Sequence, residues 1–127
     1  MTRSTAEPTT ADAAALARRF YDHVDDGNVP GLVAMFAPRA SYHRPGYAPF
    51  EGQDGITEFY SGVRKIRSGR HTLTSVVATD DTIAVRGEFQ GTLHDGSPVD
   101  LRFADFFELG PDRRFTRRDT FFFAPLA

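Results

Sequence analysis

Asp105 is the residue whose type is least expected at its position. It lies in the segment LRFADFFELG, residues 101–110, among large apolar side chains. In a strand, alternate residues share a face, so Asp105 shares one with Phe103 and Phe107. An unpaired charge in such surroundings is costly, and burial favours the neutral acid. We therefore consider Asp105 a candidate proton donor. The alternative is a structural carboxylate that an arginine or the backbone satisfies.

Asp119 is the second candidate carboxylate. In a strand it shares a face with Arg117, whose cation favours an ionised carboxylate, and with Phe121. Two carboxylates held in different protonation states are a common basis for acid/base catalysis. If both face one cavity, Asp119 would be the base that activates water, a substrate hydroxyl or a C–H bond. Asp105 or Glu88 would then be the proton donor.

Arginines could support these carboxylates. Arg86 and Arg44 would orient them or stabilise the oxyanion charge that develops during reaction. For Arg86 and Glu88 the alternative is an exposed charge pair, because apolar residues occupy alternate positions 83, 85 and 89 of the same segment. His43 is a further candidate pocket acid or base. It neighbours Tyr42, although successive strand side chains point to opposite faces.

Other classes of site lack their sequence patterns. The four histidines are dispersed and form neither an HxH nor an HExxH spacing, so we expect no metal site. There is no glycine-rich phosphate loop and no cysteine, and we expect no cofactor. A net charge of −2 argues against nucleic acid as a partner. No apolar run is long enough for a membrane span, and the polar N-terminus lacks a secretory signal. These features favour a cytoplasmic protein.

The hydrophobic periodicity predicts the elements that hold these residues. Residues 1–10 are expected to be a disordered tail, and residues 11–127 one α+β domain. Short turns between the later strands indicate an antiparallel meander, which the helices would cover on one face to leave a pocket between the two layers. The expected helices span residues 12–25, 28–36 and 54–66, and the expected strands span 39–44, 71–79, 82–93, 99–109 and 114–123.

Four segments resemble the SnoaL-like proteins of the NTF2-like superfamily. They are FYDHVDDGNVPGLVAMFAPRASYHRPG, FEGQDGITEFY, VDLRFADFFELG and RRDTFFF. This superfamily includes limonene-epoxide hydrolase, ketosteroid isomerase and polyketide cyclases. The resemblance implies a cone-shaped fold in which three N-terminal helices pack on a curved, mostly antiparallel sheet. It also implies a homodimer that packs through the sheet.

Individual positions carry this resemblance further. Asp105 matches the protonated aspartate of ketosteroid isomerase, but Arg44 stands at its base position and Phe20 at its tyrosine position. Tyr42 matches the water-binding tyrosine of limonene-epoxide hydrolase, where Arg44 replaces an asparagine. Arg86-Gly87-Glu88 resembles the hydrolase's bridging Arg-x-Asp motif, with Glu for Asp. Arg118-Asp119-Thr120-Phe121 is similar to its last-strand motif.

The resemblance implies a cofactor-independent acid/base enzyme acting on a small apolar molecule. Epoxide opening, by hydrolysis or cyclisation, and polyketide-type ring closure are the most concrete versions. The alternatives are a non-catalytic protein that binds a hydrophobic ligand, a dimeric scaffold, and a carbonyl-type isomerase that uses Asp105. The expected substrate-binding residues are Tyr42, His43, Phe20, Phe103, Phe107 and Phe121.

Overall fold

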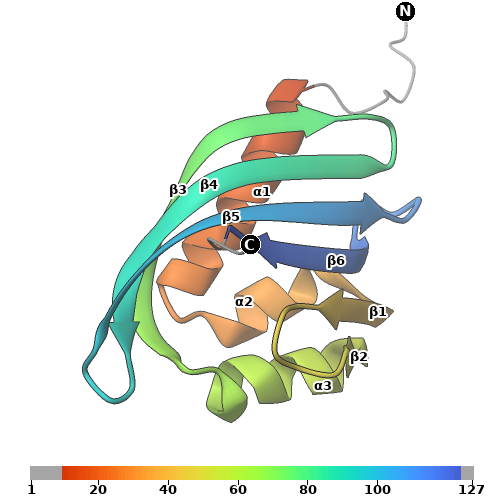
Figure 1. Ribbon diagram of the computed structural model, residues 1–127. Helices are drawn as coiled ribbons and strands as arrows, with labels where there is room; N and C mark the ends of the chain where they lie inside the picture. The colour runs from red at the N-terminus through yellow and green to blue at the C-terminus, as the bar shows by residue number, and fades with distance from the viewer. Residues whose placement is uncertain (1–9, 124–127) are drawn as a thin grey trace, which may run out of the picture.

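A computed structural model describes residues 10–123, in which helices pack on one face of a six-stranded sheet (Figure 1). The strand order is β2-β1-β6-β5-β4-β3. Strands β1 and β6 are parallel, and all other neighbours are antiparallel. The elements are α1 (Thr10–Asp25), α2 (Val29–Ala34), β1 (Phe36–His43), β2 (Phe50–Glu51), α3 (Gly52–Glu58), the π-helical turn η1 (Phe59–Val63), β3 (Ile66–Ala78), β4 (Thr82–Leu93), β5 (Pro98–Leu109) and β6 (Phe115–Phe122).

The expected boundaries differ from these mainly in the first half of the chain. Most of the tail expected at residues 1–10 lies outside the described residues, and Thr10 already begins α1. The third helix is not continuous to residue 66, because α3 changes to the π-helical η1 and β3 begins at Ile66. The two-residue β2 was not predicted. Among residues 10–123, none of the helices combines the length and the apolar character that crossing a bilayer requires.

Helix α1 covers the sheet with a face of small and aromatic side chains. Ala13, Ala17, Phe20, Tyr21 and Val24 are all buried, at the spacing that places them along one side of a helix. The alanines let the helix approach the sheet closely, and the aromatic rings fill the space beyond them.

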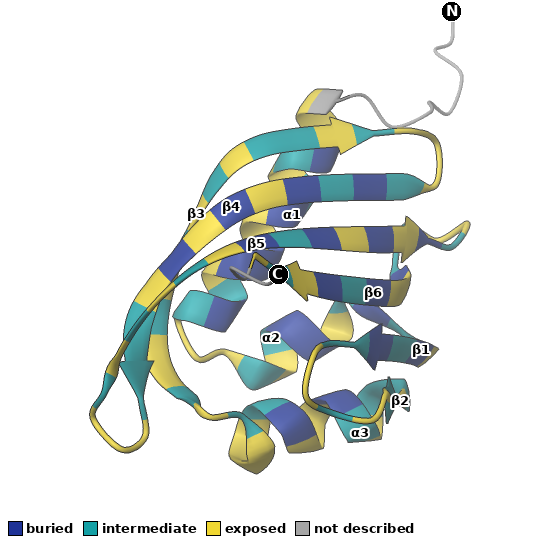
Figure 2. Cartoon of the chain, viewed as in Figure 1, coloured by how far each residue is buried: buried dark blue, intermediate teal, exposed yellow. Residues whose placement is uncertain are grey.

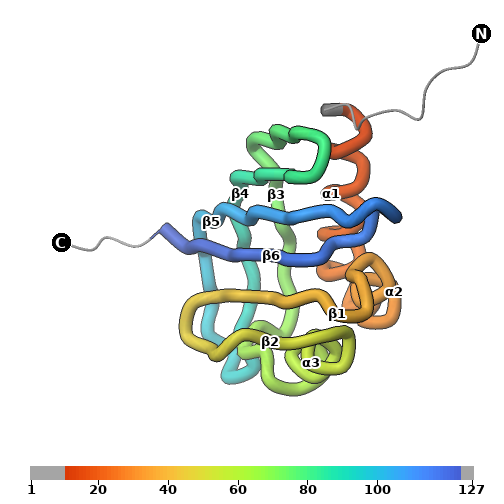
Figure 3. The backbone as a smooth tube through the Cα atoms, turned by 90° about the vertical axis from the view of Figure 1, so that its right-hand side faces the viewer, coloured from red at the N-terminus to blue at the C-terminus, as the bar shows by residue number. Residues whose placement is uncertain are grey.

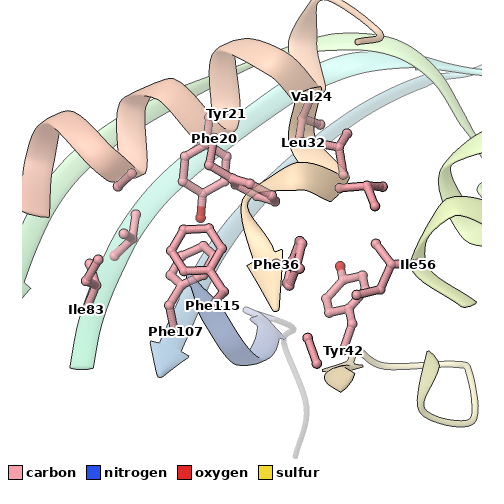
Figure 4. Close-up of a cluster of buried hydrophobic side chains, with 14 of the residues drawn as sticks. Phe20, Tyr21, Val24, Leu32, Phe36, Tyr42, Ile56, Ile83, Phe107 and Phe115 are labelled. Atoms are coloured by element: carbon pink, nitrogen blue, oxygen red, sulfur yellow. The ribbon is translucent and has the colours of Figure 1, made fainter. Parts of the chain in front are cut away.

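Buried aromatic rings hold the layers together (Figure 4). The Phe20 ring meets Phe36, Phe107 and Phe115 edge to face, with centroids 5.4–5.7 Å apart. Such pairs stabilise a core beyond the area they bury. Phe20 and Phe107 were expected to line the substrate pocket, but they lie in this core.

Strands β3, β4 and β5 are long and strongly bent (Figure 1). Glycines allow the bend where strands and rings approach closely. A Cβ on Gly91 would lie 2.3 Å from the carbonyl oxygen of Ser68 and 2.7 Å from the Phe89 ring. The sheet remains open, with β2 and β3 at its edges. The expected cone is therefore confirmed only in part, as a bent sheet with helices on one face.

A β-bulge in β6 decides which of its side chains face the helices. Leu109 pairs with Phe115, whereas the preceding Glu108 pairs with Arg117, so Thr116 is an extra residue on β6. Phe115 and Arg118 consequently share the inner face, although their positions differ by an odd number. Figure 2 shows the alternation of buried and exposed residues along β4 and β5, and Figure 3 shows β6 between β5 and β1.

Candidate functional site

Asp105 lies at the centre of a buried hydrogen-bond cluster. Its side chain is 0% exposed. Oδ2 accepts hydrogen bonds from the Tyr21 hydroxyl and from Nη2 of Arg118, the latter at 2.8 Å. Oδ1 accepts a hydrogen bond from the hydroxyl of Thr120, its cross-strand neighbour on β6. Three donors, one of them cationic, thus surround a carboxylate that was expected to be an isolated neutral acid. These contacts match the alternative of a carboxylate satisfied by arginine.

Arg118 connects this carboxylate to a second tyrosine. Its side chain is 4% exposed, and Nη1 donates a hydrogen bond to the Tyr60 hydroxyl at 2.7 Å. Burial alone would lower the pKa of Arg118, but the charge of Asp105 and the nearby tyrosines raise it well above its ordinary value. Burial, and then the charge of Asp105, raises the pKa of Tyr21 as well. Arg118 is therefore a permanent cation, and Tyr21 a permanent donor.

His71 and Asp25 form a second pair beside this cluster. Asp25, the last residue of α1, accepts the backbone N–H of His71 at 2.9 Å through Oδ2. Its Oδ1 lies 2.6 Å from His71 Nδ1. Burial lowers the pKa of His71 below its ordinary 6.5, although Asp25 opposes this shift. The carboxylate thus holds the proton on Nδ1, and Nε2 is left as the basic nitrogen of a neutral ring.

One cavity brings the two groups together. It is small: the centres of water-sized spheres occupy about 20 Å³, within about 340 Å³ of space between the atoms that is partly open to solvent. That is room for roughly one water molecule, so a larger ligand would have to move lining side chains. The lining residues are Arg44, Tyr60, Arg64, Ile66, His71, Phe89, Leu101, Phe103, Asp105, Arg118, Thr120 and Phe122.

Three of the residues expected at the site line this cavity: Asp105, Arg44 and Phe103. Tyr42 lies just behind the wall. It is fully buried, its hydroxyl accepts a hydrogen bond from Arg44 Nη1 at 2.8 Å, and Thr120 Oγ1 lies 3.4 Å from it.

The other expected catalytic residues lie on the outer face of the sheet. Asp119 pairs there with Arg117, whose Nε lies 3.0 Å from Oδ1. It therefore does not share a cavity with Asp105, because Arg118, not Asp119, points inward from β6. Arg86 and Glu88 are exposed on β4, as their apolar alternate neighbours indicated.

Two expected substrate-binding residues also lie away from the cavity. His43 lies 3.2 Å from the Ser41 hydroxyl and borders a separate shallow hollow with Asp119 and Phe121. Phe121 is 54% exposed. Both side chains belong to the outer side of the sheet, so neither can contact a molecule in the cavity.

Several site residues were not predicted from the sequence. Tyr21 and Arg118 each adjoin a residue that was selected, Phe20 and Asp119, so the error was one position in each case. His71 is bound by a carboxylate 46 positions away, a distance at which no motif spacing operates. Tyr60 and Arg64 stand in a segment that was assigned to a helix without a role in the site.

A bent, open sheet with helices on one face and a small polar cavity is an α+β arrangement of the NTF2-like type. The chain belongs to the SnoaL-like domain family, whose model matches residues 17–118. This result confirms the resemblance that the four sequence segments indicated.

Solved structures with the same fold include an enzyme and a protein that was co-crystallised with an organic acid. The epoxide hydrolase/cyclase-like enzyme SalBIII, described in pyran ring formation in the polyether salinomycin, has a TM-score of 0.77 and 19% identity, covering 89% of this chain and 92% of its own. TerC, co-crystallised with polyporic acid, has a TM-score of 0.76 and 20% identity over 87% of this chain and 91% of its own.

An NTF2-like protein of unknown function from Burkholderia pseudomallei K96243 has a TM-score of 0.79 and 19% identity, covering 87% of this chain and 90% of its own. At sequence identities this low, the similarity to these structures shows only that the fold is shared. The sequence matches no curated protein.

Proposed function

We propose that this protein is an acid/base enzyme that acts without a cofactor on a small, largely apolar molecule bound in the cavity. His71 would be the base, and Tyr60 with Arg118 the acid and oxyanion-stabilising pair. The observation that carries the proposal is the His71–Asp25 pair at 2.6 Å, in the wall of the cavity that Tyr60 and Arg118 also line. This assignment replaces Asp119, which points away.

His71 has the properties that a general base needs. Its lowered pKa keeps it neutral near pH 7, and Asp25 stabilises the imidazolium that forms when Nε2 takes a proton. The Tyr60 hydroxyl accepts a hydrogen bond from Arg118, so its own proton remains available for a substrate oxygen. Asp105 acts through Arg118 and is in this scheme a positioning residue.

These roles fit epoxide opening. His71 Nε2 would take the proton of water or of a substrate hydroxyl, and the oxygen so activated would attack an epoxide carbon. As the carbon–oxygen bond breaks, the released oxygen takes the proton of Tyr60, and Arg118 stabilises the charge that develops. The description of SalBIII in pyran ring formation supports this version by analogy of fold.

The same residues fit polyketide-type ring closure. His71 would take the proton from a carbon between two carbonyl groups, and that carbon would attack a second carbonyl carbon. The carbonyl oxygen then becomes a hydroxyl with the proton of Tyr60. Epoxide opening and ring closure both need one base and, on the opposite side of the reacting atoms, one proton donor directed at an oxygen. The chemical nature of the substrate therefore determines which of the two reactions occurs.

The test measures both reactions with His71→Gln and a matched control, His43→Gln, which alters a histidine on the outer face. Epoxides in oxygen-18 water report opening, and deuterium exchange into aryl 1,3-diketones reports C–H deprotonation. We expect His71→Gln to lower kcat/KM by about 10²–10⁴-fold, the range of general base catalysis, and His43→Gln to leave it unchanged.

The pH profile gives a second readout. A base must be unprotonated, and burial lowers the pKa of His71 below that of an ordinary histidine. We therefore expect kcat/KM to decline at low pH, and the decline to begin at a lower pH than an ordinary histidine base would give. Equal rates for His71→Gln and the wild type would reject His71 as base. Tight ligand retention without product or exchange would favour the non-catalytic binding protein instead.

A further inference from the structure

The cavity contains more positive than negative charge. Arg44, Arg64 and Arg118 line it, together with one carboxylate, Asp105. Asp105 is engaged by Arg118 at 2.8 Å. Neither Arg44 nor Arg64 has a carboxylate oxygen within 4.0 Å among residues 10–123. Two cations in the wall of one cavity are therefore without a counterion in the part of the chain that the structure describes.

Hydrogen-bond donors on these arginines are also unsatisfied. The Nε atoms of Arg44, Arg64 and Arg118 are buried and lack a partner within the described residues. Buried polar groups in proteins are nearly always paired, and leaving one unpaired costs about 1–3 kcal/mol. Burial lowers the pKa of Arg64; Tyr60 and Tyr42 oppose this shift, and the charges of Arg44 and Arg118 add to it to a smaller extent. The free protein thus holds cations that an anion would stabilise.

The surroundings indicate what kind of anion would fit. The guanidinium carbon of Arg44 lies 4.9 Å from the centre of the Phe59 ring and 5.2 Å from that of Phe122. That of Arg64 lies 5.1 Å from the centre of the Tyr60 ring. The rest of the wall includes Phe89, Leu101 and Phe103. An inorganic anion would leave this apolar surface uncovered, whereas an organic acid that moved lining side chains aside would cover both parts.

We propose that the cavity binds an organic anion, in which a carboxylate or an ionised enol or phenol is attached to an apolar body, with its charged oxygens between Arg44 and Arg64. This inference rests on the proposed function in taking the cavity as the substrate site. It adds a charged group to the small apolar molecule that the sequence led us to expect. The apolar body would then extend along Phe89 and Phe103 toward His71, which adjoins both rings at centroid distances of 4.6 and 5.4 Å.

Pairs of ligands with similar shape, of which one is an anion and the other is neutral, measure how much the charge contributes to binding. Isothermal titration calorimetry would compare 2-naphthoate with 2-naphthamide, and 2-hydroxy-1,4-naphthoquinone, which is ionised at neutral pH, with its 2-methoxy ether. Hydrogen bonds to a charged group contribute about 1.5–3 kcal/mol, so we expect at least one acid to bind about tenfold or more tightly than its neutral counterpart. The first pair tests a carboxylate, and the second an enolate.

Substitutions of arginines then test which residues cause the preference for the acid over its neutral counterpart. In the double variant Arg44→Met/Arg64→Met the acid and its neutral counterpart should bind alike, whereas Arg70→Met, which removes an exposed arginine of β3, should keep the wild-type preference. Circular dichroism checks that each variant folds, and Arg64→Gln serves as a smaller change if the double variant does not.

Three outcomes would overturn the proposal. They are acids that bind no more tightly than their neutral counterparts, acids that do not bind at all, and a preference that survives the loss of both arginines. Titrations repeated on His71→Gln keep this result separate from the proposed function. That variant should keep the preference for the acid over its neutral counterpart even where turnover is lost, so a failure of the base assignment would not mimic a failure of anion binding.

Discussion

Asp105 shows how one buried carboxylate can organise a site by holding other groups in place. Removing an ion pair from water is expensive, and the attraction within the pair offsets this cost only when further hydrogen bonds satisfy the remaining atoms. Here Tyr21 and Thr120 supply those hydrogen bonds, and Arg118 supplies the counter-charge. The result is an arginine fixed in orientation, which can hold the Tyr60 hydroxyl beside the cavity.

The stability of the fold should therefore depend on Asp105 far more than on Asp119. Asp105→Asn leaves the charge of Arg118 buried without compensation, so we expect the free energy of unfolding to fall by about 3–5 kcal/mol. The matched control, Asp119→Asn, weakens a partly exposed pair and should cost less than about 1 kcal/mol. Urea unfolding followed by circular dichroism measures both changes.

A second comparison isolates the uncompensated charge. Replacing both partners by apolar residues, Asp105→Leu with Arg118→Met, should destabilise the protein less than Asp105→Asn alone, because the uncompensated charge of Arg118 is then absent. Equal losses for Asp105→Asn and Asp119→Asn would contradict the central position that we assign to Asp105.

At the scale of elements, periodicity predicted most of the fold. The apolar alternation of β4 and β5 and the helical spacing of α1 follow from local burial on one face, so they were visible in the sequence. Asp105 could be selected for the same reason, as a charge on a buried face. The exposure of Arg86 and Glu88 was likewise indicated by their apolar neighbours on β4.

What periodicity could not predict was a change of face within a strand. The extra residue Thr116 brings Phe115 and Arg118 to the same side of β6, and a strict alternation from Phe115 would have turned Asp119 inward instead. The position of a bulge depends on how the strand pairs with its neighbour, so it cannot be predicted from the alternation of apolar residues within the strand itself. The His71–Asp25 pair was missed for a related reason, since it joins the end of α1 to β3 only after folding.

The bend of the sheet should depend on glycines that admit close contacts. In Gly91→Ala the new Cβ would lie 2.3 Å from the backbone oxygen of Ser68, which cannot move without its strand. We expect a loss of about 1–3 kcal/mol in the free energy of unfolding, as for overpacked cores. Gly62→Ala, at a position with no atom within 4 Å of an added Cβ, is the control and should be neutral. Thermal unfolding of the two variants gives the comparison, and a neutral Gly91→Ala would show that the close approach is not needed.

At the scale of the whole molecule, the outer face of the sheet carries apolar surface that the helices do not cover. Phe106 and Phe121 are 44% and 54% exposed, and their ring centroids lie 5.9 Å apart. Charges of both signs surround them, since Glu108 lies opposite Arg117 in the strand register and Glu88 lies opposite Arg102. A cluster of exposed aromatic residues ringed by charges of both signs is typical of an interaction surface.

We propose that a second copy of the chain covers this face. An interface of two-fold symmetry places one patch against itself, which requires apolar residues at its centre and both charges around it, as here. We expect the wild type to sediment with twice the 14.1 kDa of one chain, and Phe121→Arg to sediment as a monomer, because two cations would then meet at the centre of the interface. Val63→Arg, at an exposed apolar position of the π-helical turn η1 and outside the sheet, is the matched control and should leave the dimer intact. A wild type that sediments at 14.1 kDa across the micromolar range would exclude the dimer and leave the aromatic patch to a different partner.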